Sequence, residues 1–210
     1  MGSIVLGKEY FPKKNRYLVD NINRNAIISR LKRIQPGDLL LVKTPGTIYK
    51  IGRKITKNIY DHIAVVLYDD ETLNIVVPKT IIRPTTIFSK PNRIPLIVRP
   101  KWKNTSQLKS FIIEMTKFKS SIYNKKKTII GILLSTLYSR LGIKFRMKKL
   151  DETSRRWICT EAILICLMKA FPEFKAITRL KLDYNSIGFA TTNDFLRISE
   201  QFPELLNVVY

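Results

Sequence analysis

The hydrophobic period of the chain changes halfway along its length, and this change limits the folds that the sequence can adopt. Between residues 38 and 99, apolar residues gather in short runs separated by Pro, Gly, Asn and Asp, a pattern typical of strands and turns. From residue 106 onward, apolar residues recur mainly with helical spacing. Strands followed by helices predict an α+β protein, with a small and mostly antiparallel sheet packed against helices.

The expected strands are short. They cover residues 38–43, 61–68, 73–77, 79–84, 93–99 and 205–210. The run at 61–68 is almost entirely apolar, which favours a buried strand. Residues 69–72 are expected to form a hairpin turn, and Pro78 to kink the chain before the sheet continues.

Helical spacing is found in both halves of the chain. The expected helices cover residues 15–34, 48–59, 106–118, 128–141, 157–171 and 193–201. Thr105 or Ser106 is the expected N-cap of the third of these, because hydroxyl side chains accept hydrogen bonds from the first free N–H groups of a helix. Gly142 is suited to closing the fourth.

A chain of 210 residues is long enough for one domain with a substantial core. We therefore expect a single domain over 1–210, with an N-terminal extension or helix at 1–33 and the core at 34–200. The start of the chain lacks the pattern of a signal peptide, and the longest apolar stretch, 129–138, is too short to span a bilayer. These features predict a cytoplasmic or intracellular protein, with peripheral membrane or virion association as an alternative.

The chain is strongly basic, with 38 Lys and Arg against 16 Asp and Glu and a formal charge of +22. Such a charge favours an anionic membrane or another polyanion as a partner, although it also fits a merely soluble surface. No nucleic-acid-binding motif accompanies the charge. The basic residues are spread along the chain in small clusters, at Lys13-Lys14, Lys125-Lys126-Lys127, Lys148-Lys149 and Arg155-Arg156.

The two cysteines, Cys159 and Cys166, are seven positions apart. On one helix this spacing separates them by about 10.5 Å along the axis, too far for a disulfide. With a single histidine in the chain, the residues also supply a poor set of zinc ligands. We expect neither a metal nor a cofactor.

Cys159 lies where polar residues give way to an apolar helix. A thiol in the first turn of a helix faces unpaired N–H groups and the positive end of the macrodipole, which lower its pKa. Arg155 and Arg156 act in the same direction. Cys166, deeper in the same helix, better fits a small buried hydrophobic residue.

His62, the only histidine, opens the apolar run at 61–68. A histidine at the edge of a strand is compatible with a structural role or with a catalytic one. Position alone does not separate the two.

The ordered motifs around these two residues resemble the permuted papain-like cysteine hydrolases and acyltransferases, the superfamily of permuted NlpC-type peptidases and lecithin–retinol acyltransferase. Over residues 34–200 they appear in the family's order. The similar segments are QPGDLLL at 35–41, IYKIGRKIT at 48–56, YDHIAVV at 60–66, SIYN at 121–124, CTEAI at 159–163 and the tail at 187–195.

The resemblance implies a papain-like core with Cys159 as the nucleophile and His62 as its base. A thioester would form on Cys159, and the backbone N–H of Cys159 would help to stabilise the oxyanion. The family also places a polar residue on the next strand to orient the histidine. The expected position falls near Val76 or Val77, so Asn74 and Thr80 are the candidates. A backbone carbonyl in that role, or a loss of activity, is the alternative.

The predicted function is a cysteine-dependent hydrolase or acyltransferase acting on an amide or ester, with a peptide or lipid acyl group as substrate. The alternative is a papain-like fold with weakened catalysis that serves as a basic structural or binding protein, docked to a membrane, to nucleic acid or to a virion-like assembly.

Overall fold

The computed structural model describes residues 31–56, 58–68, 70–89, 95–124, 156–174 and 191–209, together with the isolated positions 29, 126 and 129. Of the expected elements, the helix at 128–141 and most of the helix at 15–34 lie outside the described residues. So do Arg155, the clusters at residues 13–14 and 148–149, and residues 187–190 of the tail segment at 187–195.

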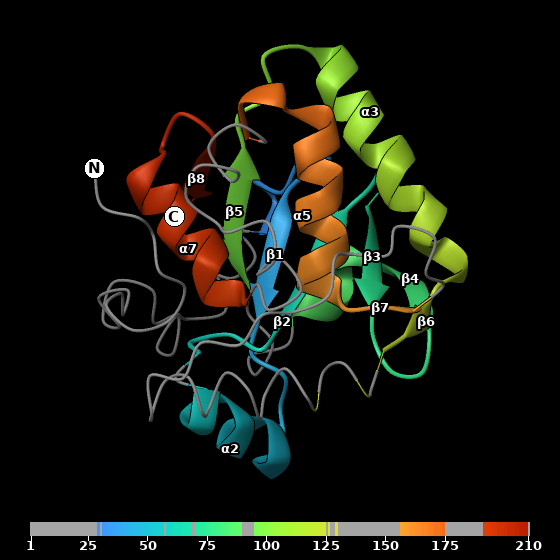
Figure 1. The fold of residues 1–210 in the computed structure, drawn as a ribbon, viewed down its shortest axis with the longest axis vertical. Helices are drawn as coiled ribbons and strands as arrows, with labels where there is room; N and C mark the ends of the chain where they lie inside the picture. The colour runs from blue at the N-terminus through green and yellow to red at the C-terminus, as the bar shows by residue number, and fades with distance from the viewer. Residues whose placement is uncertain are drawn as a thin grey trace.

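Six strands form one sheet in which every neighbouring pair is antiparallel. Its spatial order is β4-β3-β2-β1-β5-β8 (Figure 1). The strands are β1 (Leu39–Val42), β2 (His62–Val66), β3 (Glu71–Ile75), β4 (Thr80–Pro84), β5 (Leu96–Pro100) and β8 (Leu206–Val209). β8 pairs with β5 although it lies beyond the expected core range of 34–200.

The hairpin from β2 to β4 differs in detail from the expected one. β3 begins at Glu71, inside the segment expected to be a turn, and Asp70 takes the positive φ of 63° that the tight reversal requires. After the cis Val77–Pro78 peptide bond the chain reverses, so residues 80–84 form a separate antiparallel strand beside β3. The expected strand at 79–84 is confirmed as β4, which runs antiparallel to β3.

The main helices are α2 (Thr47–Thr56), α3 (Thr105–Thr116), α5 (Cys159–Ala170) and α7 (Thr192–Gln201). The short elements are η2 (Thr85–Ser89), η4 (Lys117–Ser120) and the parallel pair β6 (Ile122–Tyr123) and β7 (Arg156–Trp157). The N-cap of α3 is Asn104, one residue before Thr105, because Asn104 accepts a hydrogen bond from the backbone N–H of Gln107 at 2.9 Å. The prediction of Thr105 or Ser106 as N-cap is therefore wrong.

The sheet is buried on both faces, which explains the continuous apolar run of β1. Leu39 and Leu41 face the cluster formed with α3, α5 and α7, whereas Leu40 and Val42 face a second cluster around Phe88. Figure 1 shows α5 and α3 across one face of the sheet, and α2 beyond the ends of β1 and β2, apart from the other helices. The chain is thus α+β, as the change of period predicts. Among the described residues, no helix has both the length and the apolar character needed to cross a bilayer.

The turn that leads into β1 is tightly packed. Gly37 has a φ of +85°, and a Cβ at this position would lie 2.6 Å from Leu108 Cδ1 and 2.8 Å from Trp102 Cζ2. The next residue, Asp38, is buried, and its carboxylate accepts hydrogen bonds from Arg99 Nε at 2.7 Å and from the Gln35 backbone N–H at 2.8 Å. The Pro36-Gly37-Asp38 segment therefore has a structural role. The ion pair of Asp38 with Arg99 links the turn before β1 to β5.

Candidate active site

Asn74 contacts the ring of His62. The pairing of β2 with β3 sets Val65 opposite Leu73 and Val66 opposite Thr72, so Asn74 lies across from Ala64, on the same face of the sheet as His62. His62 Nε2 lies 3.3 Å from Asn74 Oδ1. The polar partner of the histidine is thus Asn74, one of the two candidates, two or three positions before the expected place near Val76 or Val77.

The polarity of this contact follows from the other hydrogen bonds of the Asn74 amide. Asn74 Nδ2 donates to the Thr72 carbonyl oxygen at 3.2 Å and to Thr72 Oγ1 at 3.1 Å, while that hydroxyl donates to the Arg83 carbonyl oxygen at 3.0 Å. A carbonyl oxygen can only accept, so the orientation of the amide is fixed and Oδ1 must face the imidazole. The His62 Nε2 therefore carries the proton, and Nδ1 keeps a free lone pair.

His62 is set up as a neutral imidazole. Burial lowers its pKa below the ordinary 6.5, against the opposing influence of the Asn74 hydrogen bond and the nearby Asp61 carboxylate. A neutral ring with an unprotonated Nδ1 is the form that accepts a proton. The site can thus supply a general base at neutral pH.

Cys159 is the first residue of α5, and its side chain is only 7% exposed. Backbone N–H groups of Ile63, Thr160 and Cys159 itself lie against the thiol and favour its thiolate. Burial outweighs them, however, and raises the pKa of Cys159 to about 11. The expectation of a lowered thiol pKa is therefore wrong, because desolvation of the charged form exceeds the contribution of the helix terminus.

Cys166 differs from Cys159 in its surroundings. It is fully buried in the core, and desolvation raises its pKa strongly. No backbone N–H group stabilises its thiolate among the contacts that shift its pKa. This agrees with its expected role as a small core residue.

Cys159 lies beside the strand residue that follows His62, but its thiol is not hydrogen-bonded to the His62 ring. The Cys159 thiol meets β2 at Ile63, the residue that follows His62. Along β2, Ile63 and Val65 belong to the cluster that contains α5, whereas Ala64 and Val66 belong to the opposite face. The imidazole lies on the Asn74 side, and within the described part of the chain no hydrogen bond joins it to the thiol.

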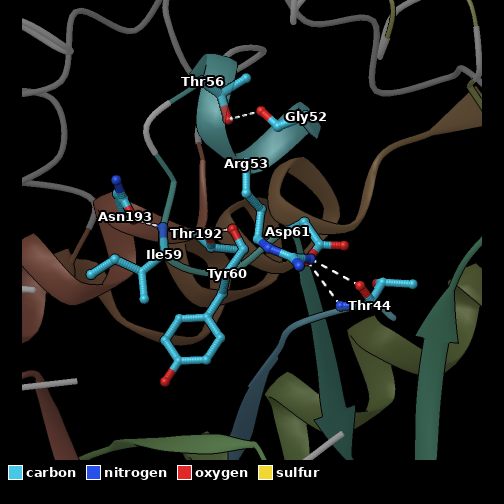
Figure 2. Close-up of polar contacts among 9 residues, drawn as sticks. All are labelled: Thr44, Gly52, Arg53, Thr56, Ile59, Tyr60, Asp61, Thr192 and Asn193. Atoms are coloured by element: carbon cyan, nitrogen blue, oxygen red, sulfur yellow. Dashed lines mark hydrogen bonds and ion pairs between the residues drawn. The ribbon is translucent and has the colours of Figure 1, made fainter. Parts of the chain in front are cut away.

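A polar cluster that the sequence did not predict holds the segment before His62. Asp61 Oδ1 accepts hydrogen bonds from Arg53 of α2 and from the Thr44 backbone N–H, the latter at 2.9 Å (Figure 2). Arg53 also donates to the Thr44 carbonyl oxygen at 2.9 Å. These bonds tie α2 to the ends of β1 and β2. The one local signal for them is an Asp directly before the His.

The start of α7 holds the same segment from another side. Asn193 Oδ1 accepts the Ile59 backbone N–H at 3.1 Å, and the Thr192 hydroxyl donates to the Tyr60 carbonyl oxygen (Figure 2). Residues 59–61 are thus fixed by α2 and α7 together. The backbone that carries His62 is therefore preorganised by the nearby α2 and by α7, which is distant in the sequence.

Thr80, the other candidate for the third residue, does not reach the histidine. It lies opposite Ile75 in the β3–β4 pairing, and its backbone N–H donates to the Ser121 carbonyl oxygen at 2.9 Å. Its hydroxyl is buried and makes no hydrogen bond. Among the described residues, no group of three or more His, Cys, Asp and Glu side chains is arranged to hold a metal ion.

No protein-family model and no curated protein matches the chain. The resemblance to the permuted papain-like superfamily therefore stays a prediction that rests on the residues themselves.

Proposed function

We propose that the chain is a cysteine-dependent hydrolase or acyltransferase of the permuted papain-like kind, with Cys159 as nucleophile, His62 as base and Asn74 as the residue that orients the base. The observation that carries the proposal is the bond from His62 Nε2 to Asn74 Oδ1. Its polarity leaves Nδ1 free to accept a proton, and the next residue of the strand touches the Cys159 thiol.

The proposed reaction requires Nδ1 of His62 to approach the thiol while Nε2–H keeps its bond to Asn74. Nδ1 takes the thiol proton as Sγ attacks the acyl carbon, so the thiolate forms only during the reaction. A thiol with a pKa of about 11 requires this general-base route, because almost none of it is ionised at neutral pH. The backbone N–H of Cys159 donates to the oxyanion of the tetrahedral intermediate.

The intermediate collapses by breaking the bond to the leaving alcohol or amine, which takes the proton from Nδ1. The product is a thioester on Cys159. Water or another nucleophile then gives a proton to Nδ1 and attacks the thioester carbonyl. Sγ leaves and regains the proton, so atoms and charges balance over the cycle. Water yields hydrolysis, and an acceptor alcohol or amine yields acyl transfer.

Turnover of an activated ester and of a peptide amide tests the proposal. Cys159→Ala is expected to abolish turnover, whereas Cys166→Ala, a matched change in the same helix, is expected to retain it. His62→Ala should reduce turnover by at least about 100-fold, the usual contribution of general-base catalysis. Equal turnover in the wild type and Cys159→Ala would refute the proposal.

A non-catalytic role as a basic binding protein is the second candidate. It is supported by the burial of Cys159, by its raised pKa and by the lack of a thiol–imidazole hydrogen bond within the described residues. If this role is correct, the protein binds polyanions in a salt-sensitive way, and Cys159→Ala does not change the affinity. Turnover that depends on Cys159 would exclude it as the sole function.

A further inference from the structure

α2 presents apolar side chains to solvent instead of to the core. None of its residues is buried, and Ile48 is 83%, Tyr49 49% and Ile51 52% exposed. Three of the eight exposed large hydrophobic side chains among the described residues therefore come from this one helix. Gly52 has open space around it as well, since a Cβ built there would meet no atom within 4 Å.

The orientation of α2 is fixed by Arg53. At 100° per residue, Ile48 and Ile51 lie about 140–160° around the helix from Arg53. Arg53 points inward, because it pairs with Asp61 and donates to the Thr44 carbonyl oxygen (Figure 2). The isoleucines must therefore point away from the body of the protein. The exposed face is thus held in place by the bonds of Arg53 on the opposite side of the helix.

Lys54 and, next to it, Lys50 border one side of the isoleucine face, about 60° and 100° around the helix from Ile51. Both are exposed, and they lie next to each other on the helix surface, beside Ile51. An apolar stripe bordered by lysines is the arrangement of helices that lie in the surface of an anionic bilayer. The lysine stems extend along the apolar layer while their charges reach the headgroups. The formal charge of +22 on the whole chain favours the same partner.

We propose that α2 docks the protein on an anionic lipid surface, with Ile48 and Ile51 inserted at the boundary of headgroups and acyl chains and with Lys50 and Lys54 against acidic headgroups. The docking surface is Ile48, Lys50, Ile51 and Lys54. It does not depend on catalysis, so it stands or falls separately from the proposed enzymatic activity.

Co-sedimentation with vesicles tests the docking surface, in the Cys159→Ala background so that turnover plays no part. The protein is expected to bind vesicles of phosphatidylcholine and phosphatidylserine in equal parts, and to bind pure phosphatidylcholine much more weakly. Lys50→Gln with Lys54→Gln should weaken binding about 25-fold, from about fivefold for each lysine. Ile48→Asp with Ile51→Asp should abolish it. These variants should fold normally, because no residue of α2 is buried.

Matched controls come from α3, where Ile113 is 59% exposed and Lys109 is exposed too. Ile113→Asp and Lys109→Gln should bind the mixed vesicles as the wild type does. The proposal is overturned if the wild type does not bind, or if Ile48→Asp with Ile51→Asp binds equally well, since the charge alone would then suffice. It is also overturned if the α2 changes alter only self-association, measured by gel filtration, because a second copy would then be the partner.

Discussion

Replacing Asn74 with leucine keeps a similar volume but removes the amide that joins His62 to Thr72. Three hydrogen bonds are lost, at about 0.5–1.5 kcal/mol each. Additional apolar burial by leucine returns about 1–2 kcal/mol. The two contributions together leave a net loss of between zero and about 3.5 kcal/mol in the free energy of unfolding. The larger consequence is chemical, since Nε2–H no longer has its acceptor and the imidazole tautomers redistribute.

The chain contains a single histidine, so a long-range ¹H–¹⁵N spectrum of ¹⁵N-histidine-labelled protein reports on His62 alone. The wild type is expected to be the Nε2–H tautomer at neutral pH. Asn74→Leu should move the population toward Nδ1–H and lower turnover of the activated ester. Asn74→Asp retains an acceptor, so it should retain the tautomer and raise the pKa of His62 through its negative charge. A wild type with the proton on Nδ1, or an unchanged tautomer in Asn74→Leu, would refute the reasoning.

The remaining predictions concern stability. Gly37→Ala should cost about 2–5 kcal/mol in urea unfolding, from the strain of a positive φ and the overpacking against its neighbours. Gly52→Ala, in open space on α2, should instead stabilise by up to about 1 kcal/mol, and a similar loss in both variants would contradict the close packing at Gly37. Asn104→Ala should cost about 1 kcal/mol in the same assay, because it removes the cap of α3, and no loss would argue against that cap. Because the folded pKa of Cys159 is about 11 and the ordinary value is 9.0, stability should fall as the pH rises through this window, and fall less steeply in Cys159→Ala. The folded pKa of His62 lies below 6.5, so the unfolded chain binds more protons as the pH falls below that value, and stability should also decline there.

Much of the fold could be predicted from local patterns. The apolar runs at 38–43 and 61–68 form β1 and β2. Both faces of the sheet are covered, so apolar side chains are needed on both sides of these strands. Cys159 was correctly placed at the start of a helix, since the change from polar to apolar sequence marks that boundary. These features depend on residues that are close in the sequence.

The details of the site depend on contacts that local sequence does not encode. Asn74 reaches His62 because the pairing of β2 with β3 sets Asn74 opposite Ala64, on the same face of the sheet as His62, and a single sequence does not encode this register. The pKa of Cys159 is raised because packing removes the thiol from water, which a helix-terminus argument ignores. The bond between Arg53 and Asp61 joins a helix to a strand end, and no periodic pattern predicts such a pair.

The central claim is that Cys159 forms a thioester with His62 as its base. In the Cys166→Ala background the chain contains one cysteine, so an acyl adduct on a thiol can be assigned without ambiguity. Mass spectrometry after brief exposure to an activated ester should find a hydroxylamine-sensitive acyl group on Cys159, formed at least about 100-fold more slowly in His62→Ala. No adduct on Cys159, or an adduct that forms at the same rate without His62, would contradict the account.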